Sequence, residues 1–176
     1  TILISTAFYL FFTTIKEFFI QKFNNFPQLI AHFGFSLLIL SILFNSLLSS
    51  EIITNMKVGE KYNYKKNEIF FKKIEQKKQN NYNSITGFFV IKDQKGRAIN
   101  LKPELRIYNQ PSVVTSEADI KTSIFEDKFL VMNIVKGGEY FNIRYQTKPL
   151  MIWIWISILL LSLGGSLSLF GRFYEK

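Results

Sequence analysis

Charged residues are distributed very unevenly along this chain, and their separation constrains the fold more than any other feature of the sequence. Of the 176 residues, positions 149–171 contain no Asp, Glu, Lys or Arg, and positions 1–49 contain three. The remaining charges lie mostly in between, although 48% of the chain is hydrophobic. This pattern is typical of a membrane protein with a polar insert and excludes an intrinsically disordered chain or a collagen. Because the chain has no cysteine, disulfide-stapled secreted domains, thiolate metal sites and thiol catalysis are also excluded within it.

Three apolar segments are candidates for membrane helices. About 20 apolar residues are needed to cross a bilayer, and both Gln28–Leu48 and Pro149–Gly171 meet this requirement. The segment Ile2–Ile15 is short, so we expect it to be extended either by residues 18–20 or by residues ahead of Thr1. The predicted fold class is therefore membrane α-helical, with two or three transmembrane helices. Residues 1–49 would hold the first two helices, and residues 148–176 the last helix and a short basic tail.

The orientation in the membrane follows from the short loop and the tail, where basic residues slightly exceed acidic ones, at Lys16, Lys22, Arg172 and Lys176. Such loops stay on the cytoplasmic or matrix side of a membrane. Residues 50–147 are then expected on the opposite side, in the periplasm or the intermembrane space. Trp153 and Trp155, at the start of the last helix, are expected in the headgroup layer on that side.

The insert, residues 50–147, has the pattern of a β-rich domain. Short β-branched or aromatic segments alternate with turn residues such as Asp93–Gly96, Asn109–Pro111 and Lys136–Gly138. The predicted strands are Tyr82–Asp93, Ile99–Leu101, Leu105–Tyr108, Phe129–Val135 and Tyr140–Tyr145. With no long helical pattern between them, they predict a small antiparallel sandwich or barrel.

His32 is the only histidine, and it lies about one turn inside a predicted membrane helix. An ionisable side chain at that depth is costly unless it faces protein, a cavity or a cofactor. Neutral imidazole is a common metal ligand and an axial ligand of haem iron, and Ser36, four residues on, is placed to support the ring through a hydrogen bond. The alternative is a histidine near the interface that bonds a neighbouring helix or water.

The stretch Lys57–Lys78 contains eight lysines with Tyr and Phe between them. Acidic residues are interspersed and arginine is absent, so we expect a solvated edge or face of a sheet with no specific ligand and no nucleic acid. We identify no catalytic residues, because no paired carboxylates, phosphate-binding glycine loop or Ser, His and Asp set can be assembled. In the last helix a surface of small residues predicts close helix packing, at Ser162, Gly164, Gly165, Ser166 and Ser168.

Several segments, in their order, resemble the C-terminal part of cytochrome c maturation protein F, the haem lyase membrane subunit of the Ccm pathway. The resemblance covers roughly residues 28–176. It rests on Ala31–Gly34, Ser49–Glu51, Asn55–Glu60, Asn81–Tyr82, Pro103–Tyr108, Thr115–Ile120, Lys148–Leu150, Trp153–Trp155 and Gly164–Gly165. The abundance of residues with AT-rich codons adds the expectation of a mitochondrially encoded protein.

The resemblance implies that His32 is one axial ligand of a transmembrane haem b whose second histidine lies outside this chain. It further implies a role in attaching haem to apocytochrome c, in the mitochondrial or bacterial inner membrane. The implied partners are the N-terminal part of the lyase or another membrane subunit, a haem chaperone, apocytochrome c and the lipid bilayer. The family's Trp-rich haem-handling loop is not found in this sequence, so we expect a fragment or split subunit that is not catalytic alone.

Two alternatives from other functional classes remain open at the level of the sequence. A descendant of this family retained as a structural scaffold in a large respiratory assembly would carry the same histidine. A generic membrane anchor that presents a β domain to soluble partners would have the same distribution of charge. A haem beside His32 is what separates the lyase from both.

Overall fold

The computed structural model describes residues 2–20, 26–135, 137 and 139–174. The chain divides into two compact units. The helical unit comprises residues 1–49, 123–126 and 148–176, and the β unit comprises residues 50–122 and 127–147. Four residues used in the predictions above, Lys22, Lys136, Gly138 and Lys176, lie outside the described residues.

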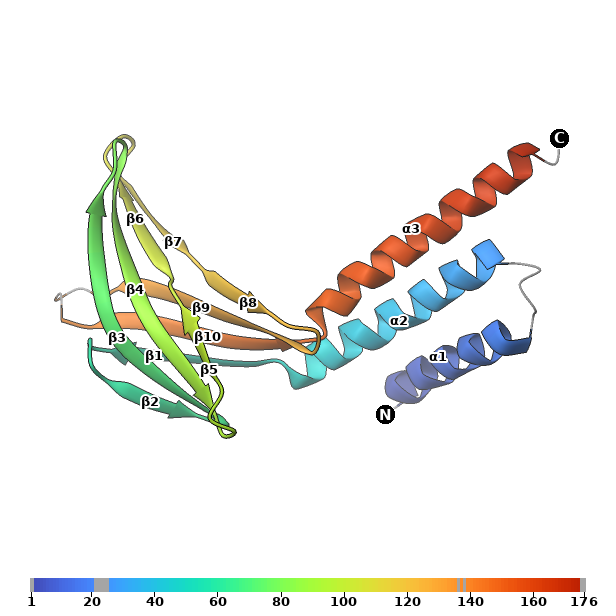
Figure 1. Cartoon of the computed structure of the whole chain (residues 1–176), viewed down its shortest axis with the longest axis horizontal. Coiled ribbons are helices and arrows are strands. Elements are labelled where there is room, and N and C mark those ends of the chain that lie inside the picture. Colours follow the sequence, from blue (N-terminus) through green and yellow to red (C-terminus); the bar gives the residue numbers. More distant parts are fainter. Residues whose placement is uncertain (1, 21–25, 136, 138, 175–176) are drawn as a thin grey trace. The chain divides into compact units, whose positions relative to one another are not determined.

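The helical unit contains α1 (Ile2–Ile20), α2 (Phe26–Leu48) and α3 (Met151–Tyr174), which Figure 1 draws in blue, light blue and red. Within the described residues, α2 over its whole length and α3 from Met151 to Phe170 are long and apolar enough to cross a membrane. Pro27, at the first turn of α2, suits a helix start because its missing N–H would have no partner inside the helix.

Helices α2 and α3 approach each other so closely that their backbones touch. A Cβ atom added at Gly164 of α3 would lie 2.6 Å from the Ala31 nitrogen, and one added at Gly34 of α2 would lie 2.9 Å from the Leu161 nitrogen. Of the predicted small-residue surface, Gly164 makes this contact, whereas Gly165 has nothing within 4 Å. The close approach confirms the predicted type of packing and assigns it to a single glycine of α3.

Helix α1 packs on α2 through aromatic rings. The ring centroids of Phe8 and Phe44 lie 5.9 Å apart in an edge-on arrangement, and those of Phe11 and Phe33 also lie 5.9 Å apart. Such pairs contribute beyond the area that they bury. They place α1 beside the part of α2 that contains the histidine.

Among the described residues, the β unit contains ten strands in two antiparallel sheets. The first sheet has the order β1-β10-β9-β8, and the second has the order β2-β3-β4-β6-β7, with β5 also paired to β4. The strands are β1 (Ser50–Met56), β2 (Lys61–Tyr64), β3 (Asn67–Lys78), β4 (Tyr82–Asp93), β5 (Ala98–Leu101), β6 (Glu104–Tyr108), β7 (Val113–Glu117), β8 (Asp119–Thr122), β9 (Glu126–Ile134) and β10 (Phe141–Pro149).

One apolar core is shared by the two sheets, which makes the β unit a sandwich rather than a barrel. Phe71 of β3 stacks on Phe89 of β4 with ring centroids 4.2 Å apart, and both rings are almost fully buried. Phe141 of the other sheet meets Phe71 edge-on, with ring centroids 5.6 Å apart. The core is Met56, Ile69, Phe71, Phe89, Ile91, Leu101, Leu105, Leu130, Met132, Phe141, Ile143 and Tyr145. The predicted fold class, membrane helices with an inserted antiparallel β domain, is confirmed.

The bounds of some strands agree with the prediction, whereas other strands were not predicted individually. Strand β4 has the predicted bounds, and the predicted turn at residues 93–96 is closed by a bond from the Gly96 nitrogen to the Asp93 carbonyl, 3.0 Å long. Gly96 has a φ of 75°, which glycine adopts without strain. Strands β2 and β3 were predicted only as an edge or face of a sheet within Lys57–Lys78, without bounds, and no segment was named for β1, β7 or β8. Lysine and acidic residues in β3 mask its apolar alternation, although Ile69 and Phe71 are fully buried.

Candidate functional site

His32 lies in the second turn of α2, on a face of the helix that does not pack against α3. Its neighbour Ala31 faces Gly164 of α3, and Gly34 faces Leu161 and Ser157. Successive helical residues point about 100° apart, so the imidazole is turned away from that contact. Its side chain is 53% exposed. The histidine is thus held on a rigid helix pair while its ring is accessible from outside.

Among the described residues, Glu17 of α1 is a charged group that lies next to the imidazole. Its Oε2 atom lies 4.0 Å from His32 Nδ1, and its side chain is 49% exposed. A carboxylate on the Nδ1 side favours the tautomer with the proton on Nδ1, which leaves the Nε2 lone pair for another partner. Glu17 was not among the residues predicted for this site. Glu17 and His32 are 15 positions apart on different helices, so helical periodicity gives no signal that they lie close together.

Ser36 is fully buried, and its hydroxyl donates a hydrogen bond of 3.0 Å to the Phe33 carbonyl of its own helix. This bond satisfies the hydroxyl where α2 has no water. The predicted supporting bond from Ser36 to the histidine is not among those of the described residues and stays a prediction.

The arrangement fits half of a two-histidine haem site. The Glu17 carboxylate lies 4.0 Å from Nδ1, beyond hydrogen-bond distance, and the His32 side chain is 53% exposed, so the ring is open to an iron atom shared with another chain segment. Among the described residues there is no group of three or more His, Asp or Glu side chains that would hold a metal ion without such an outside ligand. The residues present therefore suit an axial ligand and do not suit a self-contained metal centre.

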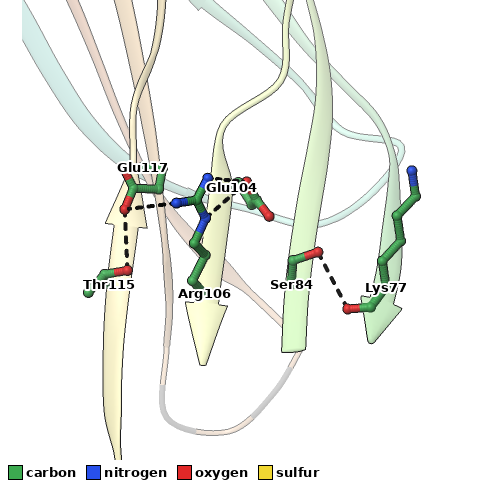
Figure 2. Close-up of polar contacts among 6 residues, drawn as sticks. All are labelled: Lys77, Ser84, Glu104, Arg106, Thr115 and Glu117. Carbon is green, nitrogen blue, oxygen red and sulfur yellow. Dashed lines mark hydrogen bonds and ion pairs between the residues drawn. The ribbon is translucent and has the colours of Figure 1, made fainter. Parts of the chain in front are cut away.

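Arg106 lies at the centre of a second polar cluster, on the six-stranded sheet of the β unit (Figure 2). Glu104 of β6 and Glu117 of β7 are direct cross-strand neighbours, and like charges in that position repel. The guanidinium binds both carboxylates, with Nη2 3.1 Å from Glu104 Oε2 and Nη1 3.9 Å from Glu117 Oε1. The hydrogen bond to Glu104 is the main reason that the pKa of Arg106 is raised. The cluster stabilises the pairing of β6 with β7.

The Lys57–Lys78 stretch forms β2 and β3 and the residues around them. Several of its lysines are paired, since Lys61 Nζ lies 3.5 Å from Glu68 Oε1 and Lys73 binds Glu75. The Lys73 ammonium also lies 4.7 Å from the centroid of the Phe88 ring. These local pairs suit the predicted solvated sheet surface.

Comparison with known proteins identifies the family. Residues 47–149 match the family model described as the CcmF C-terminal beta-sandwich. The cytochrome c-type biogenesis protein ccl1 of Rhodobacter capsulatus is 30% identical over 72% of this chain and 19% of its own length. NrfE of Haemophilus influenzae is 23% identical over 97% of this chain, and CcmF of Escherichia coli is 27% identical over 88%. The chain spans 27% and 24% of those two relatives.

A solved structure has the same fold. The protein described as cytochrome c heme lyase CcmF superposes with a TM-score of 0.61 at 19% identity, over 78% of this chain and 23% of the other. At this identity the likeness supports the fold alone. Because the family model matches more than half of the chain, the resemblance seen in the sequence is confirmed, and the chain belongs to the CcmF family of cytochrome c-type biogenesis proteins, of which it carries the C-terminal β-sandwich.

Proposed function

We propose that this chain is the C-terminal part of a cytochrome c haem lyase and that His32 is one axial ligand of a haem b held within the membrane. The observation that carries the proposal is an accessible imidazole on a membrane-length helix, with the Glu17 carboxylate 4.0 Å from Nδ1, in a chain of the CcmF family. The second axial histidine comes from outside this chain, since His32 is the only histidine in the sequence.

In this proposal each residue has a defined task. His32 would bind iron through Nε2, and the Glu17 carboxylate on the Nδ1 side would favour the tautomer with the proton on Nδ1. The close packing of Ala31 on Gly164 fixes the height and rotation of the histidine on α2. The haem, when bound, supplies one-electron redox chemistry at a potential set by its axial ligands and its low-dielectric surroundings.

The same proposal places the chain in an inner membrane, either bacterial or mitochondrial, with the β unit in the periplasm or the intermembrane space. The excess of residues with AT-rich codons favours the mitochondrial location and an organellar gene. The partners are the N-terminal part of the lyase or another membrane subunit, a haem chaperone and apocytochrome c. The β unit would contact these partners on the side where cytochrome c matures.

A reduced-minus-oxidised absorption spectrum of the purified membrane assembly tests the ligand. We expect a b-type band in the wild type, its loss in His32→Ala, and its retention in Glu17→Gln with a shifted midpoint potential, because a neutral amide polarises the imidazole less. The matched control Ile42→Ala, at an exposed position of the same helix, should leave both band and potential unchanged. A wild-type assembly without the band, or a band unaffected by His32→Ala, would refute ligation and favour the scaffold function.

A further inference from the structure

The segment Ser123–Glu126, which connects β8 to β9, is a tight turn with an apolar tip. Ser123 closes the turn, since its nitrogen donates to the Glu126 carbonyl over 3.1 Å and its hydroxyl accepts from the Glu126 nitrogen over 3.1 Å. Ile124 and Phe125 form the tip, and they are 59% and 74% exposed. Turn tips in water usually consist of Gly, Pro, Asn, Asp and Ser, so two large apolar side chains at this place need an explanation.

The tip is attached to the first turn of α3, and it belongs to the helical unit. The Trp153 indole donates a hydrogen bond of 2.9 Å to the Ile124 carbonyl, and the Leu150 nitrogen donates one of 2.9 Å to the Phe125 carbonyl. Leu150 has a φ of 57°, an uncommon conformation that these contacts help to hold. Both carbonyls at the tip thus have partners, and the position of the tip relative to α3 is fixed.

We propose that Ile124 and Phe125 insert into the bilayer, at the boundary between headgroups and acyl chains beside the start of α3. Helix α3 begins at Met151 and is long enough to cross the membrane, so its first turn lies at that boundary. Trp153 and the 64% exposed Trp155 are residue types that favour the same layer. A backbone whose carbonyls are already bonded can enter this layer without losing hydrogen bonds to water.

The inserted turn is a second membrane contact, with Phe125 26 positions ahead of Met151, and it would fix the depth and rotation of the first turn of α3. The inference rests on α3 crossing the membrane and is independent of haem binding. It also gives Trp153 a task beyond that of an interfacial residue, because its indole couples the turn to the helix.

Site-directed spin labelling tests the proposal, and the absence of cysteine from the chain makes it practical. Phe125→Cys and, as a second position, Ile124→Cys are labelled in the full assembly in vesicles of phosphatidylcholine and phosphatidylglycerol, with the unsubstituted assembly as background. The reference is Lys95→Cys, at the exposed turn between β4 and β5. The ratio of collisions with oxygen to collisions with a water-soluble nickel chelate is expected to be several-fold higher at positions 124 and 125 than at position 95.

Two results would overturn the proposal. A ratio at both tip positions equal to that at position 95 would mean that the turn lies in water. Low access of both reagents would mean that another protein segment covers the turn. Loss of the b-type band in the proposed haem experiment has no bearing on either result, so the two proposals fail separately.

Discussion

Gly164→Ala is the sharpest test of how α2 and α3 hold the histidine. The added methyl group would lie 2.6 Å from the Ala31 nitrogen, 2.7 Å from the Pro27 carbonyl oxygen and 2.8 Å from the Ala31 Cβ. The first distance is about 0.8 Å short of the 3.4 Å at which ordinary van der Waals contact begins. Two of the three atoms are backbone, so no side chain can rotate to make room, and the helices must separate.

The magnitude follows from two opposing effects. Alanine is better than glycine in a helix by about 1 kcal/mol, whereas overpacking a close contact costs about 1–3 kcal/mol. Gly165→Ala is the matched control, because a Cβ atom there meets nothing within 4 Å and experiences only the first effect. The difference in unfolding free energy between the two variants therefore isolates the packing cost, and we expect Gly164→Ala to be less stable by about 1–3 kcal/mol.

The assay is reversible unfolding of the chain in mixed micelles with increasing dodecyl sulfate, followed by helical circular dichroism. If haem ligation is as proposed, the shift of Ala31 also perturbs its neighbour His32, and the b-type band of Gly164→Ala should weaken or broaden. Equal unfolding curves for the two alanine variants would refute the backbone contact between α2 and α3.

Two further predictions concern the β unit. Phe71→Ala removes a ring that is fully buried and stacked on Phe89, and it should lower the free energy of unfolding in denaturant by about 3–5 kcal/mol. The control Phe70→Ala, at the preceding residue of the strand, should lower it much less. Similar losses of stability in the two variants would contradict the assigned core. The hydrogen bond from Lys57 Nζ to Glu139 Oε2, 2.6 Å long, lowers the pKa of Glu139 and raises that of Lys57. The pair should therefore stabilise the fold at pH values between the ordinary pKa values of the two groups. This stability should be lost as the pH falls through the lowered pKa of the Glu139 carboxyl, and also as the pH rises through the raised pKa of the Lys57 ammonium. In thermal unfolding, the difference between the wild type and Glu139→Gln should be constant near neutral pH and vanish in acid, and a difference that persists there would contradict the pairing.

Part of the fold could be predicted directly from the local sequence. Strand β4 was predicted at its true bounds because Phe88, Phe89, Val90 and Ile91 form an uninterrupted β-branched and aromatic run that ends at a turn. Strands β2 and β3 were predicted only as an edge or face of a sheet, without bounds, because lysine and acidic residues dominate the stretch Lys57–Lys78. No segment was named for β7 and β8, because both strands are short and only partly covered. Whether such segments become strands depends on their burial by a second sheet, which the sequence of a single strand does not specify.

The candidate site, like the fold, was predicted only in part from the sequence. The length and apolarity of α2 place a lone histidine at membrane depth, and that placement alone raises the question of a cofactor. Glu17 became part of the site only when α1 packed on α2, since the two residues are on different helices. Ser36 was predicted from helical spacing to support the ring, and that bond stays a prediction. In the structure the buried Ser36 hydroxyl donates to the nearby Phe33 carbonyl of its own helix.

The sequence alone therefore determined which segments are apolar enough for a membrane and which region is a β domain. It also determined that the only histidine lies within a predicted membrane helix. These properties depend on residues that are neighbours in the chain or on the same element. The tertiary structure decided that Gly164 rather than Gly165 meets α2, that Glu17 faces the imidazole, and that Trp153 binds the apolar turn at Ile124. Each of these contacts joins residues far apart in sequence, and its geometry is set by how whole elements pack.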